Sequence, residues 1–387
     1  METLFWVTGG LLALLWTWRS LDTAFGLPRI ADITQPQWDL AAAPAAPRLT
    51  VIVPARNEER DIEACLTSLL ALDYPDFEVI AINDRSTDST GAIMDRLAAG
   101  SPRLKVIHVN DLPSGWMGKT HAMWLGGREA TGELLLFTDG DTFFRADSVR
   151  RAVACLRQRG LDHLVLFPTM LFKYAGEKVI VSFFHAALSF AHRPWKVSDP
   201  KAYDHVGVGA FNLVRRAAYE AIGSYSAMRL EVIDDLRLGK LIKDHGFRQD
   251  VVFGLDLVRI HWATGALGVV RTLSKNTFAI LRFSWTLVIG GSIGIAFLSL
   301  GPLAGLIFAS AWAKLPFAIA LAAMASLYVQ ARPVTTISPW YFFAHPLGAC
   351  LSLYAIWRSA WQTSRRGVVW RGTSYSLDLF RKAAGKD

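Results

Sequence analysis

The chain has 387 residues, of which 52% are hydrophobic, and its mean hydropathy is positive. It is therefore too apolar for an ordinary soluble domain, and the apolar excess lies at its two ends. Lys and Arg outnumber Asp and Glu by 41 to 33, which gives a net charge of +8. No predicted helix presents a basic face interleaved with aromatic residues, so the charge favours anionic lipid headgroups over nucleic acid as a partner.

An apolar segment, Leu4–Trp18, opens the chain and predicts an N-terminal transmembrane anchor over residues 1–19. A cleaved signal peptide is the alternative. It is disfavoured because no positive charge precedes the apolar stretch, which ends in bulky tryptophan rather than in small residues. Arg19 and the two tryptophans before it are expected to lie at the membrane interface. Residues 20–48, which are rich in Pro and Ala, are predicted to be a linker.

Beyond this linker, short apolar runs alternate with segments of helical spacing. The apolar runs, predicted as strands, are Leu49–Val53, Val79–Ile82, Leu104–Val109 and the run from Glu133; the helical segments carry Ile62, Cys65, Leu66, Leu69 and Leu70, and then Ile93, Met94 and Leu97. Alternating strands and helices build a mostly parallel sheet with helices on its faces, so the predicted fold class is α/β. Such sheets bind ligands at the carboxyl ends of their strands.

Two carboxylates, Asp139 and Asp141, stand one residue apart at the end of the run from Glu133. A pair of this kind can hold a divalent cation, Mg²⁺ or Mn²⁺, which in turn holds the phosphates of a nucleotide. The alternative is an ordinary turn in which the aspartates cap backbone amides. Acids at other strand and helix ends favour the metal site.

Asp84 directly follows the second strand and is expected to contact a ligand, whereas Ser86–Asp88 are expected to cap the next helix. Asp234 and Asp235 open a later helical stretch. Two acids at that position also suit the helix dipole, so capping is the alternative there. Together with a metal bound by Asp139 and Asp141, this second acid pair could supply the general base of a metal-assisted group transfer.

These residues belong to a series of motifs that resembles the family 2 glycosyltransferases of the GT-A fold. In the order of the family, the motifs are Val51–Glu59, Asn83–Thr90, Gly115–Lys119, Asp139–Asp141, Gly209–Arg216 and Ile233–Leu238. Each motif alone is weak, but the set is specific. The resemblance implies a GT-A catalytic domain over residues 49–278, Rossmann-like, with a mostly parallel sheet flanked by helices.

The resemblance also implies roles for single residues. Pro54, Arg56, Glu58 and Asp84 would line the uridine end of a nucleotide-diphosphate sugar, Lys119 would contact phosphate or uracil, Asp139 would bind ribose and metal, and Asp141 would bind the metal. Asp235, with Asp234 beside it, would take the proton from the acceptor hydroxyl. One base and no covalent nucleophile imply direct displacement with inversion at the anomeric carbon.

The chain departs from the family after this base. Cellulose and hyaluronan synthases, and ceramide glucosyltransferases, carry a Gln/Arg-x-x-Arg-Trp motif there, whereas this chain reads Arg259–Trp262 and then Arg271–Asn276. A single hexose transfer is therefore favoured over a processive polysaccharide synthase. In this respect the chain resembles hopanoid-associated and carotenoid glycosyltransferases, which implies a hopanoid, carotenoid or sphingolipid-like lipid hydroxyl as acceptor. A catalytically dead membrane scaffold is disfavoured by the intact acids.

Apolar segments also fill residues 279–357, which are predicted to hold transmembrane helices. Phe283–Val329 is long enough for two crossings of about 20 residues each, and Trp340–Trp357 is a third candidate. The catalytic domain is expected to face the cytoplasm at the inner membrane of a bacterium, together with the basic tail, residues 358–387. Three crossings would place that tail outside, so either one segment is interfacial or re-entrant, or the first block is not two full spans.

Two features lie outside these motifs. Val179–Trp195 is apolar nearly all round and predicts a helix that either packs in the domain core or lies in the membrane interface and feeds a lipid acceptor to Asp235. Cys65, Cys155 and Cys350 lack metal-ligand spacing and are expected to be buried, and the nine histidines form no zinc motif.

Overall fold

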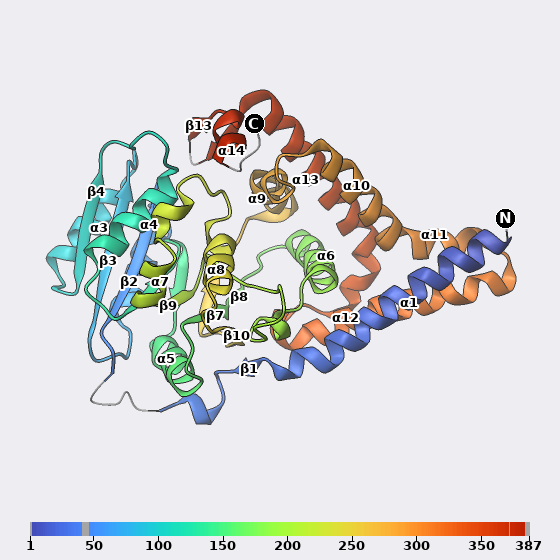
Figure 1. Cartoon of the computed structure of the whole chain (residues 1–387), viewed down its shortest axis with the longest axis horizontal. Helices are drawn as coiled ribbons and strands as arrows, with labels where there is room; N and C mark the ends of the chain where they lie inside the picture. Colours follow the sequence, from blue (N-terminus) through green and yellow to red (C-terminus); the bar gives the residue numbers. More distant parts are fainter. Residues whose placement is uncertain (1, 41–45, 371, 384–387) are drawn as a thin grey trace. The chain divides into compact units, whose positions relative to one another are not determined.

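The computed structural model describes residues 2–40, 46–370 and 372–383, which fall into two units (Figure 1). The sheet unit consists mainly of Ile30–Leu171 and Pro194–His261. The helical unit consists of Met1–Arg29, Phe172–Arg193 and Trp262–Arg381. The predicted catalytic domain, residues 49–278, thus supplies segments to both units.

An eight-stranded, mostly parallel sheet forms the centre of the sheet unit. Its strand order is β1 (Ala31–Asp32), β10 (Gln249–Phe253), β7 (His163–Phe167), β9 (Asn212–Arg215), β5 (Leu134–Phe137), β2 (Leu49–Ala55), β3 (Phe77–Asp84) and β4 (Leu104–Val109). Every pairing is parallel except those of β9, which is antiparallel to both β5 and β7. The predicted α/β class is confirmed.

Helices cover both faces of this sheet, because its strands are apolar on both sides. They are α2 (Ile62–Leu70), α3 (Thr90–Ala99), α4 (Gly118–Glu129), α5 (Ser148–Gln158), α7 (Arg216–Ala221) and α8 (Asp234–Asp244). Successive β2 residues point to opposite faces. Val51 and Val53 therefore join the core that contains Cys65 of α2, whereas Ile52 joins the core that contains Met123 of α4.

A smaller sheet, β6–β11–β8, lies in the same unit and joins three short strands. They are β6 (Thr142–Phe144), β11 (Val258–Ile260) and β8 (Thr169–Met170). Strand β6 begins directly after the Asp139–Asp141 turn and pairs with β11 in antiparallel fashion. The turn is therefore anchored by a strand at each end.

Part of the predicted linker, residues 20–48, is built into the structure. Strand β1 pairs with β10, and the buried Arg151 guanidinium donates to the carbonyls of Ile33, Thr34 and Gln35 at 3.2, 3.2 and 3.3 Å. Arg151 also forms an ion pair with Asp39 at 2.6 Å. Because these backbone groups are bonded, this stretch extends the sheet unit; residues 41–45 lie outside the described residues.

The helical unit gathers segments from three parts of the chain. It contains α1 (Glu2–Gly26), α6 (Ala175–Ala191), α9 (Gly265–Ile280), α10 (Trp285–Ile295), α11 (Gly301–Phe308), α12 (Leu315–Thr335), α13 (His345–Arg366), the hairpin β12 (Val368–Trp370) and β13 (Thr373–Tyr375), and α14 (Leu377–Ala383). Helix α6 packs with Ile180 against Val269 and Val270 of α9 and Ala355 of α13. The helix predicted over Val179–Trp195 thus ends at Ala191 and belongs to this unit, whereas Trp195 belongs to the sheet unit.

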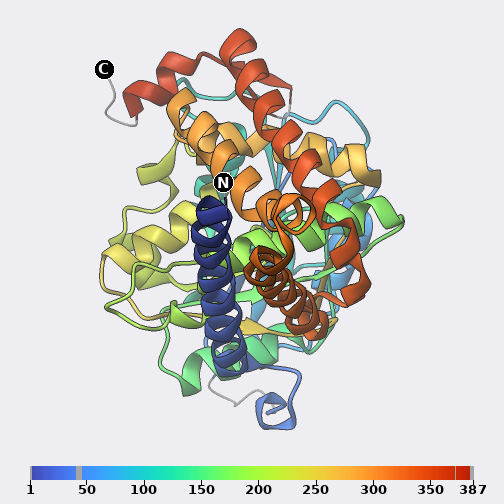
Figure 2. The ribbon, with the colours of Figure 1, turned by 90° about the vertical axis from the view of Figure 1, so that its right-hand side faces the viewer.

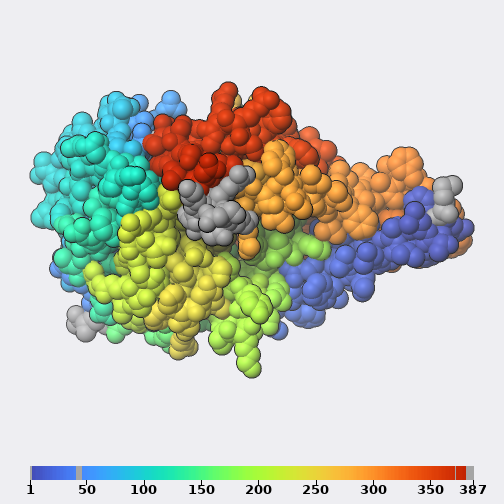
Figure 3. Space-filling view, turned by 45° about the horizontal axis from the view of Figure 1, so that its top comes forward, coloured from blue at the N-terminus to red at the C-terminus, as the bar shows by residue number. Residues whose placement is uncertain are grey.

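Helix α1 lies alongside α12, as two perpendicular ribbon views show (Figures 1 and 2), and in the space-filling view its blue surface adjoins orange surface of the C-terminal half of the chain (Figure 3). Leu12 and Trp16 pack there against Phe317, and the Trp16 indole donates to the Leu298 carbonyl at 3.0 Å. Arg19 is buried and pairs with Asp22. Arg19 and Trp16 are thus buried within the helical unit, whereas Trp18 is exposed.

Two helical stretches of the described chain are long and apolar enough to cross a membrane, Trp285–Phe308 and Ala311–Thr335. They begin within the predicted Phe283–Val329 block, and the second extends past it to Thr335. Only 17% of the first stretch is buried, so it is not a core helix of the helical unit. Neither the predicted N-terminal anchor nor the third candidate, Trp340–Trp357, is among these stretches.

Candidate active site

The residues singled out in the sequence gather at one edge of the central sheet. Strands β5, β2 and β3 are parallel neighbours, so their carboxyl ends lie together. Pro54 lies in β2 and Asp84 ends β3, whereas Arg56 and Glu58 follow β2 and the acids Asp139 and Asp141 follow β5.

Three of these acids lie close enough to Cys65 to affect the pKa of its buried thiol. Burial raises the pKa of the Cys65 thiol, and the negative charges of Asp141, Asp139 and Glu58 raise it further. The Cys65 thiol also contacts the Asp139 carbonyl oxygen at 3.7 Å. The carboxylates after β2 and β5 therefore converge above the start of α2.

Lys119, the second residue of α4, joins the two acid motifs. Its Nζ lies 2.9 Å from Asp139 Oδ1 and 3.3 Å from Asp234 Oδ1. Burial alone would lower the pKa of Lys119, but Asp139, Asp234 and Asp235 outweigh it and raise that pKa. Lys119 is therefore a permanent cation within the acid cluster, and the predicted acids are held together through it.

Asp235 is the carboxylate of the cluster best suited to proton transfer. Burial and the charge of Asp234 raise its pKa from 3.8 to about 6, against the opposing effect of Lys119. The Leu236 amide donates to Asp235 Oδ1 at 2.7 Å. A group with a pKa near 6 is ionised at neutral pH and still basic enough to accept a proton, as a general base must be.

Asp234 is buried and turned away from the amides of its own helix. Its Oδ1 faces Lys119, and its Oδ2 accepts a hydrogen bond from the Tyr225 hydroxyl at 3.4 Å. The Asp234 carboxylate thus contacts Lys119 and Tyr225, whereas Asp235 accepts from the Leu236 amide; both acids lie in the first turn of α8, where they also suit the helix dipole.

Asp84 is buried at the end of β3 and is held by Arg85. The Arg85 guanidinium donates to both carboxylate oxygens, at 2.7 and 3.1 Å. Arg85 has a left-handed backbone, with φ of 56°. Such a conformation is uncommon for a residue with a Cβ, and it turns the guanidinium back over the preceding side chain. Arg85 carries no signal of this role in the sequence pattern.

The loops after β2 and β3 are bonded to each other. The Asn57 amide donates to Ser86 Oγ at 3.1 Å, Thr87 N donates to Asn57 Oδ1 at 2.8 Å, and Glu58 N donates to Thr90 Oγ1 at 2.8 Å. The capping prediction is thus wrong for Ser86 and Thr87. It is confirmed for Asp88, which accepts from the first amide of α3 at 3.0 Å.

The segment before Asp234 is tied to the start of α4. The Met117 amide and the Thr120 hydroxyl both donate to the Arg229 carbonyl, at 2.9 and 2.6 Å, and the Arg229 guanidinium lies 5.0 Å from the Trp116 ring centroid. The Gly115–Lys119 motif thus positions the acid pair through backbone contacts as well as through Lys119.

The donor set of the site fits a divalent cation that is shared with a ligand. Among the described residues, no three His, Cys, Asp or Glu side chains form a ready-made metal cage. Mg²⁺ is commonly held by one or two carboxylates together with substrate phosphates and water, and Asp139 and Asp141 offer two such carboxylates on one turn. Lys119 Nζ contacts Asp139 Oδ1, so part of the negative charge of this turn is offset within the protein.

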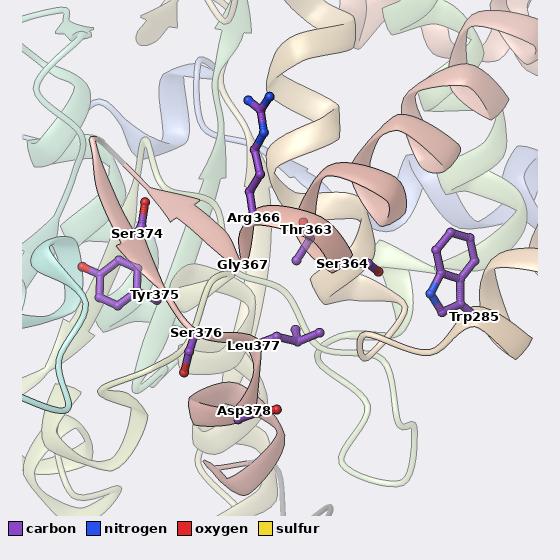
Figure 4. Close-up of a pocket in the computed structure, with 10 residues that line it drawn as sticks. All are labelled: Trp285, Thr363, Ser364, Arg366, Gly367, Ser374, Tyr375, Ser376, Leu377 and Asp378. Carbon is purple, nitrogen blue, oxygen red and sulfur yellow. The ribbon is translucent and has the colours of Figure 1, made fainter.

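A pocket of about 560 Å³ lies elsewhere, in the C-terminal part of the helical unit (Figure 4). Trp285, the end of α13 and the segment Ser374–Asp378 line it. None of the predicted site residues is among its walls, so this pocket is not part of the predicted site.

Part of the chain matches a known protein family. Residues 50–223 match the family described as glycosyl transferase family 2. The chain carries a family 2 glycosyltransferase domain. This match spans β2 to α7 and includes Asp84, Lys119 and the Asp139–Asp141 turn, and it supports a glycosyltransferase.

Related proteins are similar over most of the chain. The 4,4'-diaponeurosporenoate glycosyltransferase of Staphylococcus aureus (strain USA300) is 28% identical over 351 residues, which are 85% of this chain and 88% of that protein. Among solved structures, mannosyltransferase PcManGT from Pyrobaculum calidifontis in complex with GDP-Man and Mn²⁺ is 21% identical, with a TM-score of 0.49, over 90% of this chain and 97% of that one. Staphylococcus aureus TarS 1-349 in complex with UDP is 16% identical, with a TM-score of 0.39, over 82% and 91%.

Proposed function

We propose that the protein is an inverting glycosyltransferase that moves one hexose from a nucleotide-diphosphate sugar, with UDP as the expected nucleotide, to a membrane lipid. The observation that carries this proposal is the Asp139–Lys119–Asp234 bridge with Asp235 beside it. It brings the predicted donor-binding turn, which lies within the matched residues 50–223, and the predicted base, which follows them, into one cluster.

In the proposed reaction, Asp235 accepts the proton of the acceptor hydroxyl while that oxygen bonds to the anomeric carbon of the sugar. The bond from this carbon to the diphosphate breaks with its electron pair remaining on the diphosphate, so a single displacement inverts the configuration. Lys119 holds Asp139 and Asp234 in place and offsets part of their charge. A divalent cation held by Asp139 and Asp141 would neutralise charge on the departing diphosphate.

The relative from Staphylococcus aureus supports a lipid acceptor, because it is named for a carotenoid-type substrate and matches 85% of this chain. Its name also indicates a second acceptor chemistry, a lipid carboxylate. A carboxylate is already ionised at neutral pH and gives no proton to a base. The dependence of the rate on Asp235 therefore distinguishes a hydroxyl acceptor from a carboxylate acceptor.

We place the sheet unit in the bacterial cytoplasm, where nucleotide sugars are made, with the helical unit at the inner membrane. Trp285–Phe308 and Ala311–Thr335 are the two proposed crossings. Two crossings return the chain to the side from which it started, so the basic tail after Arg358 stays in the cytosol, in agreement with the charge rule.

The experiment is transfer of radiolabelled sugar from UDP-hexoses to bacterial lipid extracts by the purified full-length protein, followed by chromatography and NMR of the product. A labelled lipid with inverted anomeric configuration is expected. A product with retained configuration, or no labelled lipid with any nucleotide sugar, would refute the proposal.

A further inference from the structure

A short irregular segment, Val206–Gly209, packs against both acid motifs. A β-carbon at Gly207 would collide with the carbonyl of Asp235, and one at Gly209 would collide with the carboxylate of Asp139. Because Gly207 and Gly209 have no β-carbon, the backbone of this segment can contact both motifs. Its position therefore influences the separation of the predicted metal-binding turn and the predicted base.

Two buried amide side chains hold this segment, which belongs to no helix or strand. Gln249 of β10 accepts from the Val206 amide at 3.0 Å and donates to the Val206 carbonyl at 3.2 Å. Asn212 of β9 donates to the Val208 carbonyl at 2.6 Å. Gln249 thus secures the end of the segment next to Asp235, and Asn212 secures the end next to Asp139.

His163 of β7 connects these two amides. Its Nδ1 accepts from Gln249 Nε2 at 2.7 Å, and its Nε2 lies 3.2 Å from Asn212 Oδ1, to which it donates when Nδ1 is the acceptor. Burial lowers the pKa of His163 to about 4, so the ring is neutral and has the one donor and one acceptor that these bonds require. The side chains of His163, Asn212 and Gln249 are 0%, 1% and 2% exposed, respectively.

Helix α8 is attached to the same group. Gln249 Nε2 also lies 3.1 Å from the Gly239 carbonyl, in the helix that begins with Asp234, so its two hydrogens are shared among this carbonyl, the Val206 carbonyl and His163 Nδ1. Polar groups this deeply buried are costly unless each makes its hydrogen bonds, and a fully bonded network then specifies one arrangement of its surroundings. An apolar trio would fill the same space without fixing the backbone of Val206–Gly209.

We propose that His163, Asn212 and Gln249 form a positioning network that sets the place of Val206–Gly209, and through it the spacing of Asp139 and Asp235. Gln249 holds Val206 and so positions the base, whereas Asn212 holds Val208 and so positions the donor-binding turn. This inference rests on the proposed function, since it assigns the two ends to two parts of the same transfer.

The test compares Gln249→Met and Asn212→Leu, which keep side-chain size and remove the amide. Gln249→Met is expected to lower kcat by about tenfold to a hundredfold, the range that a small misplacement of a reacting group can cost, while the Kd of the UDP-sugar changes less than about twofold. Asn212→Leu is expected to weaken that Kd by about tenfold or more and to change kcat less. Calorimetric binding and initial rates give the two constants.

Thr50→Val is the matched control. Thr50 is fully buried near the opposite end of β2, where its hydroxyl donates to Glu78 at 2.7 Å and accepts from the Gly132 amide at 2.8 Å. Its replacement is expected to lower stability but to leave kcat and Kd unchanged. Equal changes of kcat and Kd in Gln249→Met and Asn212→Leu, or the same changes in the control, would overturn the proposal.

Hydrogen exchange provides a readout that does not depend on transfer. The Val206 amide is expected to exchange faster in Gln249→Met than in the wild type and in Thr50→Val. An unchanged exchange rate would refute the network, whether or not the protein transfers sugar. His163→Phe, which removes only the link between the amides, is a milder variant and is expected to show the same changes to a smaller extent. If the wild type transfers no sugar but exchange behaves as expected, the proposed function fails and the network stands.

Discussion

Replacement of Asp235 by Asn is the most direct test of the proposed mechanism. The substitution keeps the size of the side chain and removes its ability to accept a proton. A positioned general base contributes about two to four orders of magnitude to a rate, so kcat is expected to fall by that factor, equivalent to roughly 3–5 kcal/mol in the barrier. UDP-sugar binding is expected to change little, because Asp139, Lys119 and Asp141 are intact.

The pH dependence gives an independent measure of the same group. With a pKa of about 6, Asp235 is about one-tenth ionised at pH 5 and about nine-tenths ionised at pH 7. The kcat of the wild type is therefore expected to rise with pH through 6 and then level off. The Asp235→Asn variant is expected to lack this rise in initial-rate measurements from pH 4.5 to 8.

Stability provides the control for correct folding. The pKa of Asp235 is 3.8 in the reference state and about 6 when folded. Between these pH values the folded protein binds more protons than the unfolded chain, so its stability falls as the pH rises through this window and remains lower above it. Asp235→Asn is therefore expected to stabilise the protein at pH 7, by roughly 1–3 kcal/mol, and to raise the midpoint of thermal unfolding.

Two results would refute this reasoning. A variant with more than about one-tenth of wild-type kcat would show that Asp235 is not the base of a hydroxyl transfer, and would favour the carboxylate acceptor. A pH profile that still rises through 6 in Asp235→Asn would assign the titration to another group. A lower unfolding midpoint would show that Asp235 stabilises the fold, as a capping residue does.

Three further predictions concern the cation, the lysine bridge and the membrane. Chelation with EDTA is expected to abolish transfer and to weaken UDP binding, Mg²⁺ or Mn²⁺ to restore both, and Asp141→Ala to prevent that restoration; full activity of Asp141→Ala would exclude it as a metal ligand. Lys119→Met is expected to raise the pKa of Asp235, because the opposing cation is removed, and so to move the rise in kcat to higher pH; an unshifted profile would show that Lys119 does not act on the base. Reporter fusions after Trp357 and at Asp387 are expected to signal cytosol, and a periplasmic signal at both would favour three C-terminal crossings.

The sequence predicts those features of the site that depend on local pattern. Apolar runs such as Leu49–Val53 are long enough to identify strands, and parallel strands share a carboxyl edge, so the convergence of the acids follows from the α/β class. The Ser86–Asp88 loop shows the limit of this reasoning. Capping is a local rule, but Asn57 of the neighbouring loop competes for Ser86 and Thr87, and that loop is distant in sequence.

Long-range contacts account for what the sequence does not predict. His163 and Gln249 meet only because β7 and β10 are neighbours in the sheet, and no spacing in the sequence signals that pairing. The bridge from Lys119 to Asp234 has the same origin. Similarly, β1 is only two residues long and follows a long apolar helix, so its addition to the sheet edge depends on β10 and not on its own pattern.

The charge of the cluster explains why the proposed donor requires a cation. Lys119 contacts the carboxylates of Asp139 and Asp234, and Asp141 and Asp235 bring two further carboxylates to the same cluster. A nucleotide diphosphate is itself an anion, and like charges repel strongly in a partly buried site. A divalent cation on the Asp139–Asp141 turn would offset the negative charge of these carboxylates where the diphosphate binds. The cation is therefore expected to act first on the binding of the nucleotide: chelation should weaken the Kd of UDP while the unfolding midpoint of the ligand-free protein stays the same, and a fall in that midpoint would instead assign the cation a structural role.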